Sequence, residues 1–165
     1  MATFTLRSWR RYLPRIARRI EDAAVRGMRS AALRAKIEVI REIDTASPYP
    51  AVNTGGLRQS VQVINLPNGA EVVVDAPHAP FLEEGTRPFW PPLEPLVAWV
   101  IRKGLAPSLG DPDEQERFAI QVARAIQYAI ASRGIEPRHF LAKAMVRMPA
   151  IVQAEVGREL AAVRG

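Results

Sequence analysis

The chain has 165 residues, of which 48% are apolar and 24% are charged, and its formal net charge is +6 at pH 7. This length suits a single domain, residues 1–165, with a real core, and the composition excludes a disordered tail and a fibrous protein. The absence of cysteine excludes a disulfide framework, a thiolate metal site and a thiol nucleophile.

The N-terminal part of the chain is basic and predicts a long helix. Between Arg7 and Arg19 there are six arginines and no acidic residue. Small and apolar residues recur at three- and four-residue steps and share one helical face: Leu13, Ile16, Ile20, Ala23, Ala24, Gly27 and Ala31. The opposite face is basic: Arg7, Arg11, Arg15, Arg18, Arg29 and Lys36. Because Pro14 suits the first turn of a helix, we expect a basic arm over residues 1–12 and a main helix over about 14–44.

The next segment predicts a β-hairpin. Residues 45–56 are rich in Pro, Gly and small polar residues and read as a loop. Strands are expected over residues 57–66 and 70–75, with Pro67-Asn68-Gly69 as a tight turn, because Asn and Gly tolerate positive φ. A two-stranded hairpin is only marginally stable by itself. We therefore expect it to pack on the first helix and also to join strands of neighbouring subunits.

Start and stop signals predict four further helical segments. They span about residues 80–84, 93–103, 111–133 and 137–163. The third is expected to be capped by Asp111, with Pro112 in its first turn and Glu114 completing a capping box. Pro149 should kink or divide the last helix, because the ring removes a backbone hydrogen bond.

The apolar stripes of the last two helices are expected to face inward. These stripes are Phe118, Val122, Ala125, Ile126 and Ala129 in the third segment, and Leu141, Met145, Met148, Val152, Val156 and Leu160 in the fourth. The element order predicts an α+β fold: a long N-terminal helix, a β-hairpin forming a small antiparallel sheet, and then several helices including a kinked C-terminal one.

Features that carry enzymatic chemistry are scarce in this sequence. The two histidines, His78 and His139, lack the spacing of a metal site, and neither a phosphate-binding loop nor a nucleophile elbow is present. Glu83 and Glu84 are adjacent, so on a short helix they point about 100° apart and do not share a substrate. We therefore expect no enzyme, no cofactor, no metal and no small-molecule substrate.

Two segments are candidates for contacts between subunits. Glu83 and Glu84 lie at a helix C-terminus, where acidic groups oppose the helix dipole, so a cation such as Arg87 or Arg58 is expected nearby. That ion pair can be intrachain or can cross a subunit boundary. Phe89 and Trp90 stand in a stiff proline-rich stretch and either cover the chain's own core or anchor a neighbouring subunit.

The basic helix face also has more than one interpretation. Its arginines, with Arg7, Arg11, Arg15 and Arg18 as the candidates, can be solvated, can pair with an acidic neighbour, or can contact passing DNA through the phosphates. A membrane surface is not expected, because the apolar face of the main helix is rich in alanine. The longest apolar run, Leu96 to Ile101, is too short to cross a bilayer.

Three segments together resemble a known family. Residues 54–60, TGGLRQS, resemble a turn-into-strand signature "T-G-x-L-R-x-S". Residues 79–86, APFLEEGT, resemble "Y-A-x-x-x-E-x-G-T", although His78 stands near the position where the family commonly has Tyr. Residues 137–144, PRHFLAKA, resemble the "P-x-x-F-L-x-x-A" start of a final helix. In this order, the segments are similar to those of the tail-completion or neck proteins of long-tailed bacteriophages.

This resemblance covers roughly residues 14–160 and implies a virion protein assembled in the host cytoplasm. Such a protein would form a ring of copies, of six-fold or similar symmetry, where the head joins the tail, together with other neck, connector and tail-tube proteins. The family contributes no catalytic residues. Thr54, Gly55, Gly85 and Thr86 correspond to turns and are interpreted as structural. A tail terminator that caps the tube and, in another class, an Arg-rich DNA-binding module are the alternatives.

Overall fold

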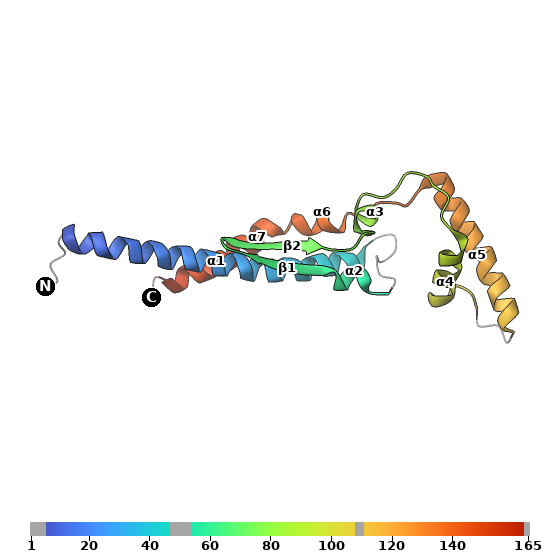
Figure 1. The fold of residues 1–165 in the computed structure, drawn as a ribbon, viewed down its shortest axis with the longest axis horizontal. Helices are drawn as coiled ribbons and strands as arrows, with labels where there is room; N and C mark the ends of the chain where they lie inside the picture. The colour runs from blue at the N-terminus through green and yellow to red at the C-terminus, as the bar shows by residue number, and fades with distance from the viewer. Residues whose placement is uncertain (1–5, 47–53, 108–110, 164–165) are drawn as a thin grey trace. The chain divides into compact units, whose positions relative to one another are not determined.

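The structure, a computed structural model, describes residues 6–46, 54–107 and 111–163. The fold is α+β, as predicted, and Figure 1 shows its elements along the chain. In order they are α1 (Leu6–Thr45), α2 (Gly56–Gln59), β1 (Val61–Leu66), β2 (Gly69–Val74), α3 (Ala79–Glu83), α4 (Leu93–Arg102), α5 (Pro112–Arg133), α6 (Phe140–Met145) and α7 (Met148–Val163).

The chain divides into two compact units, which are described separately. The first unit combines most of α1 with the hairpin, most of α6 and α7. The second unit contains the end of α1, α2, α3, α4 and α5, and it ends at Phe140. Most of the positive charge excess lies in the first unit, whereas acidic and basic residues nearly balance in the second.

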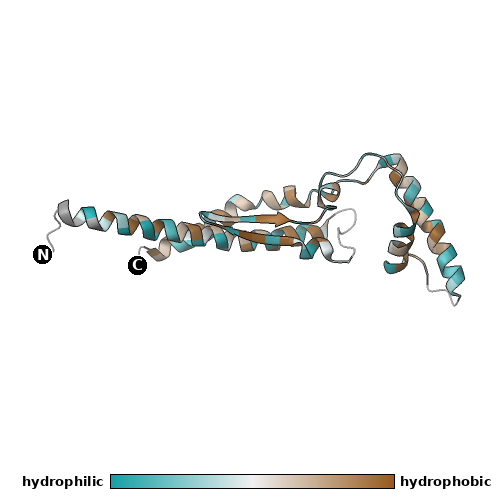
Figure 2. Cartoon of the chain, in the orientation of Figure 1, coloured by the Kyte–Doolittle hydropathy of each residue, from teal (hydrophilic) through white to brown (hydrophobic). Residues whose placement is uncertain are grey.

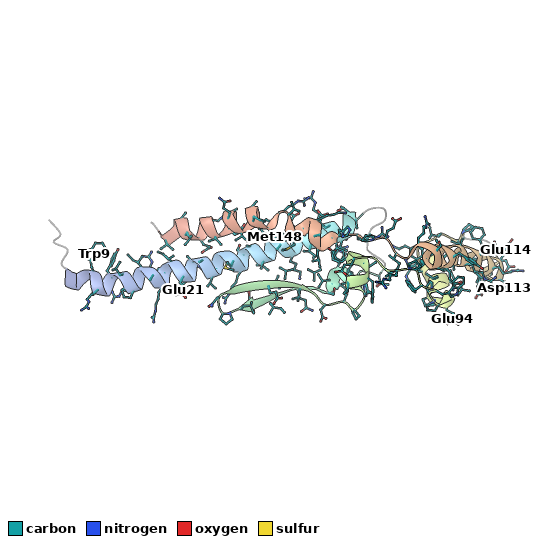
Figure 3. The ribbon with its side chains drawn as sticks, turned by 90° about the horizontal axis from the view of Figure 1, so that it is seen from above. Trp9, Glu21, Glu94, Asp113, Glu114 and Met148 are labelled. Carbon is teal, nitrogen blue, oxygen red and sulfur yellow. The ribbon has the colours of Figure 1, made fainter. Side chains whose placement is uncertain are left out.

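In the first unit, α1 lies between α7 and the hairpin, as Figure 3 shows. Ala23 and Ala31 on α1 are buried, and so is Gly27 between them. A Cβ atom on Gly27 would come within 2.6 Å of Val156 Cα, so the absent side chain is what lets α1 and α7 approach closely. The small residues of the predicted apolar face therefore form a helix–helix contact.

The hairpin has the predicted antiparallel pairing, with a shorter turn. Leu66 pairs with Gly69, so the loop consists of Pro67 and Asn68 alone. Gly69 packs against α1, where a Cβ atom on it would lie 2.9 Å from Met28 Cε, the end of a flexible side chain. Arg29 donates from Nη2 to the Leu66 carbonyl oxygen at 3.2 Å. The hairpin thus packs on the first helix, as predicted.

Two predicted boundaries in the N-terminal half are wrong. The helix does not break at Pro14, because α1 runs without interruption from Leu6 to Thr45. A proline inside a helix removes one backbone hydrogen bond, and the many Leu, Ala and Arg residues around it favour helix strongly enough to continue. The first strand also begins later than expected, since residues Gly56–Gln59 form the helical turn α2, which buries Leu57.

In the second unit, α4 and α5 pack against each other around small residues. Val100, Ala106, Ala119 and Ala123 are buried and form a core cluster. The Asp111 side chain accepts a hydrogen bond from the backbone N–H of Asp113 at 3.0 Å, which is the predicted helix cap. Figure 2 shows the contrast between the apolar residues of α4 and the hydrophilic first turns of α5.

The inward faces were predicted only in part. On α5, the buried line is Ala119, Ala123 and Gln127, whereas Phe118 is 39% exposed and Ala125 is also exposed. On the last helices, Met145 is 65% and Val152 41% exposed, and the buried residues are Phe140, Ala144 and Glu155. Periodicity gives the width of an apolar face, but the position of the neighbouring helix decides which edge of it is covered.

The last predicted helix is divided in two, as Pro149 indicated. α6 ends at Met145, and α7 begins at Met148, so that Pro149 occupies its first turn. The helical segment also begins later than predicted, at Phe140, after His139 takes a φ of 52°. None of the helices in the described ranges is both long enough and apolar enough to cross a bilayer.

Candidate functional site

Two of the resembling segments lie against each other in the second unit. The Thr86 N–H donates to the Ile135 carbonyl oxygen at 2.9 Å, and the Ile135 N–H donates to Thr86 Oγ1 at 2.9 Å. Further along, the Arg138 N–H donates to the Leu82 carbonyl at 2.8 Å. The segment around residues 79–86 is therefore hydrogen-bonded to the segment that leads into α6.

Glycines make this backbone contact possible. Gly85 has a φ of +76°, and a Cβ atom there would lie 2.5 Å from the Ile135 carbonyl oxygen. Gly134 has a φ of +78°, and its Cβ atom would lie 2.0 Å from the Thr86 carbonyl oxygen. Both positions combine a positive φ with a space that admits no side chain. Gly85 and Thr86 thus stand at a turn that holds two chain segments together.

The first resembling segment leads into α2 and contains it. Thr54 is exposed, and Gly55 has a φ of +85°, a conformation that favours glycine. Arg58 on α2 lies with its Nε 3.2 Å from Asp44 Oδ1 in the last turn of α1. Arg58 therefore has an intrachain acidic partner that the sequence did not indicate.

The other candidate interface residues all lie in the second unit and differ in exposure. Glu83 is half-buried, and Glu84 is exposed at the C-cap of α3. Arg87 is exposed, Phe89 is 43% exposed and Trp90 is 59% exposed. Neither aromatic side chain is covered within the described part of this chain as a core residue would be.

The proline-rich stretch is fixed to α5 by two contacts. Gln127 Nε2, which is buried, donates to the Pro91 carbonyl oxygen at 2.7 Å. The ring of Trp90 meets that of Tyr128 edge to face, with centroids 5.1 Å apart. These contacts hold Trp90 in place while leaving most of its surface open to solvent, and Tyr128 itself is 64% exposed. Sequence reasoning missed both Gln127 and Tyr128, since neither stands in an apolar stripe.

The basic face of α1 lies in the first unit. Arg15 and Arg18 are exposed, whereas the side chains of Arg7 and Arg11 lie outside the described part of the structure. Further along α1, Arg26 Nε lies 2.9 Å from Glu159 Oε2, and Arg19 donates to the Val163 carbonyl at 3.3 Å. Arg19 and Arg26 therefore contact α7, whereas Arg15 and Arg18 stand on the surface.

A buried carboxylate between α1 and α7 is the main charged group that the sequence did not predict. Glu155 is 1% exposed. Its Oε1 lies 2.5 Å from Arg34 Nε, and its Oε2 lies 2.6 Å from Arg158 Nη1 and 2.9 Å from Ser30 Oγ, which donates to it. The hydrogen bond from Ser30 lowers the pKa of Glu155, burial opposes this effect, and Arg158 and Arg34 lower the pKa further.

A second ion-pair group joins the two helical layers of the first unit. Arg147, between α6 and α7, forms an ion pair with Glu38 and lies 3.2 Å from Glu42 on α1. The hydrogen bond to Glu38 raises the pKa of Arg147, and the charges of Glu38 and Glu42 act in the same direction against desolvation. Both groups pair carboxylates with arginines through short contacts, an arrangement that fixes helices in place.

Within the described residues, no group of three or more histidine, aspartate or glutamate side chains is placed to hold a metal ion. Comparison with known proteins finds no family model, no curated protein and no solved structure that matches this chain.

Proposed function

We propose that this protein is a structural subunit of a long-tailed bacteriophage, a tail-completion or neck component that assembles into a ring where head and tail join. The ring would consist of six or a similar number of copies, and the chain would act by surface contact and not as an enzyme. It would be built in the host cytoplasm and retained in the neck of the virion.

The observation that carries this proposal is the exposed aromatic segment of the second unit. Phe89 and Trp90 present a large apolar surface, and the Gln127–Pro91 hydrogen bond holds their segment rigid. Exposed aromatics on a rigid support lose little conformational entropy on binding, which is typical of interface anchors. Exposed Glu84 and Arg87 nearby supply charges of both signs for the rim of such a contact.

The hairpin offers a second means of association. Within the described residues, β1 and β2 form a sheet of two strands, so each has an edge that pairs with no other described strand. An open edge accepts a further strand through backbone hydrogen bonds. A ring requires a contact between two different surfaces that closes on itself, and the aromatic segment and the hairpin edge are two such different surfaces.

Purification tests the proposal. We expect purified protein to form oligomers by sedimentation or mass photometry, alone or with tail tubes, and to be found in virions by mass spectrometry. A chain that stays monomeric in both conditions and is missing from virions would refute it. Labelling the protein in virion images would distinguish a neck ring from a tail terminator, which caps the tube.

The exposed arginines of α1 favour a second candidate function, which is DNA binding. Arg15 and Arg18 stand on the surface with no acidic residue between them in sequence. Phosphate contacts give an affinity that falls steeply with salt, with a logarithmic slope of about 0.9 per contact. If this face binds DNA, replacing Arg11, Arg15 and Arg18 by alanine should lower the slope by about 2 to 3.

The control for DNA binding is Arg124→Ala on α5, an exposed arginine in the other unit. This variant should keep the wild-type slope. Equal slopes for the wild-type protein and the triple variant would exclude the DNA-binding function.

A further inference from the structure

The apolar face of α1 is covered by α7 along only part of its length. Ala23 and Gly27 lie in the covered part, where α7 packs against α1. The end of α7 lies beside Arg19, which donates to the carbonyl oxygen of Val163 at 3.3 Å. Figure 1 shows the N-terminal part of α1 extending beyond this end of α7. The alanine-rich part of the face, which was the reason to expect no membrane surface, is therefore the part that α7 covers.

The uncovered part of this face has bulky side chains. Tyr12 is 53%, Leu13 is 54% and Ile20 is 46% exposed, with Ile16 between them half-buried. Trp9 lies edge to face with Tyr12, with 6.3 Å between ring centroids, and Figure 3 labels it near the beginning of α1. These five residues, which we call the α1 stripe, extend over about 17 Å at 1.5 Å per residue. Their exposure leaves a continuous apolar surface on the helix.

The surroundings of the α1 stripe are basic. Every charged residue on α1 before Glu21 is an arginine. At 100° per residue, exposed Arg10 and Arg15 border the stripe on its two sides, and exposed Arg18 stands opposite it. A polar face rich in arginine, beside a face that contains Trp and Leu, is typical of helices that lie in the surface of an anionic membrane.

Geometry favours a bilayer over a protein as the partner of the α1 stripe. The stripe lies on the convex surface of a helix, so a protein would need a matching apolar groove with an acidic rim. A bilayer adapts to the helix and accepts the rings of Trp9 and Tyr12 among its headgroups. Its charge also attracts every arginine within about a Debye length of 10 Å, whereas a groove pairs only with those at its rim. The stripe of a second copy is disfavoured, because two basic helices would meet.

We infer that the α1 stripe of the free chain binds the surface of an anionic lipid bilayer. The N-terminal part of α1 then lies in the plane of the membrane, with Leu13 and Ile16 reaching about 5 to 10 Å into the boundary between headgroups and acyl chains. Arg10 and Arg15 lie at the lipid phosphates. The inference goes beyond the proposed function and needs no ring, because a single copy makes the contact. An anionic surface is available in the cytoplasm, where the cytoplasmic leaflet has a negative surface potential.

Co-sedimentation of the full chain with lipid vesicles tests this inference. We expect binding to vesicles made of equal parts of phosphatidylglycerol and phosphatidylcholine, and binding weaker by about tenfold or more to pure phosphatidylcholine, which attracts no arginine. Salt should weaken the binding, because it screens the surface charge. A chain that stays off the anionic vesicles would overturn the inference, and this is the result expected if the stripe serves a protein partner.

Leu13→Gln is the decisive variant, because it removes an apolar side chain from the stripe without changing the charge. The partition coefficient on anionic vesicles should fall by roughly 10- to 100-fold. The matched control is Leu33→Gln, the same substitution in the same helix at a side chain that is 59% exposed. Leu33 lies well around the helix from the stripe, so this variant should bind like the wild type. Equal binding by the two variants would show that the stripe does not enter the bilayer.

Two arginine variants test the orientation of the helix on the membrane. Arg15→Ala removes a charge beside the stripe and should lower the partition coefficient about fivefold. Arg18→Ala removes one from the opposite side of a helix that is about 10 Å across, where screening is stronger, and should lower it less. A larger loss in Arg18→Ala would contradict the proposed orientation and overturn the inference.

Tryptophan fluorescence shows which part of the chain meets the lipid. The emission of the wild-type protein should shift to shorter wavelength on anionic vesicles, because the ring of Trp9 leaves water. Trp9→Phe should lose this shift, because the other two tryptophans, Trp90 and Trp99, lie in the second unit. A shift that persists in Trp9→Phe would place the contact elsewhere and overturn the inference.

The inference can fail or succeed independently of the functions proposed above. Leu13→Gln should keep the salt dependence of any DNA binding while it loses vesicle binding, since its charge is unchanged. A chain that is found in virion necks but does not bind anionic vesicles would overturn the inference and leave the neck function standing. Vesicle binding that requires Leu13, in a chain missing from virions, would support the inference and refute the neck function.

Discussion

Different kinds of contact stabilise the interior of each of the two units of this protein. In the first unit, α1 and α7 meet through small residues such as Gly27 and through charged groups centred on buried Glu155. In the second unit, α4 and α5 meet through Val100, Ala119 and Ala123, and tight backbone contacts join Gly85 and Gly134 to the segments opposite. The first unit therefore combines small-residue packing with buried charge, whereas the second depends on backbone conformation and close packing.

This difference predicts that the units respond separately to mutation and to pH. Regions held by independent contacts open with their own free energies, which amide hydrogen exchange reports residue by residue. A destabilising substitution within one unit is expected to lower the hydrogen-exchange protection of that unit more than that of the other. Equal loss of protection in both units would show that the comparison is wrong and that the chain unfolds as one body.

Gly134→Ala is expected to have the largest effect. The Cβ atom would lie 2.0 Å from the Thr86 carbonyl oxygen, at a φ of +78° and a ψ of −163° that side chains rarely adopt. Strain and the backbone shift together should lower the free energy of unfolding by about 4 kcal/mol. Chemical denaturation followed by hydrogen exchange measures this loss and its location in the second unit.

Gly104→Ala is the matched control for that variant. Gly104 also has a positive φ, +64°, but a Cβ atom there would meet nothing within 4 Å. Its cost should be only the conformational strain, about 1 to 2 kcal/mol. If both glycine variants cost the same, the close approach to Thr86 contributes nothing.

Gln127→Leu should have the next largest effect. The substitution keeps the volume but removes the donor to the Pro91 carbonyl, which leaves a buried acceptor without this hydrogen bond at a cost of about 1 to 3 kcal/mol. Because this bond fixes the segment that carries Trp90, the fluorescence of the three tryptophans should change as well. Unaltered stability would mean that the α4–α5 packing alone holds the segment.

Gly27→Ala tests the close contact in the first unit. Alanine favours helix by about 1 kcal/mol over glycine, but its Cβ would lie 2.6 Å from Val156 Cα, and overpacking of this kind costs about 1 to 3 kcal/mol. The net result should be a loss of about 1 kcal/mol. In Gly157→Ala, a Cβ meets nothing within 4 Å on α7, so the same substitution should stabilise by roughly 0.5 to 1 kcal/mol.

The smallest change in the free energy of unfolding is expected from lowering the pH, and it concerns Glu155. Its folded pKa lies below the ordinary value of 4.5, so the stabilisation from its charge is present above pH 4.5 and is lost as the pH falls through the folded pKa. Glu155→Gln should be less stable than the wild type at pH 7, and the difference should shrink below pH 4.5. Denaturation curves at several pH values measure it, and a constant difference would contradict the assignment.

Local signals in the sequence were enough to predict much of the fold. Asp111 and Pro112 mark the start of α5, Gly134 follows its end, and Gly104 closes α4, because caps and turns depend on residues only a few positions apart. The hairpin was predictable for the same reason, and so was the division of the last helix near Pro149. The exposed state of Phe89 and Trp90 was one of two alternatives that the sequence left open.

Tertiary structure alone decided which side of each helix is covered. Leu13 and Ala23 belong to the same periodic stripe, yet Leu13 is exposed and Ala23 is buried, because α7 reaches only as far as Arg19. Glu155 is buried because Arg34 and Ser30 of α1 meet it across the contact, and no signal within α7 announces those partners. Periodicity is a property of one segment and can be read from its own sequence. Burial depends on a second segment that is distant in sequence. Which residues are buried is therefore settled only when folding brings the two segments together.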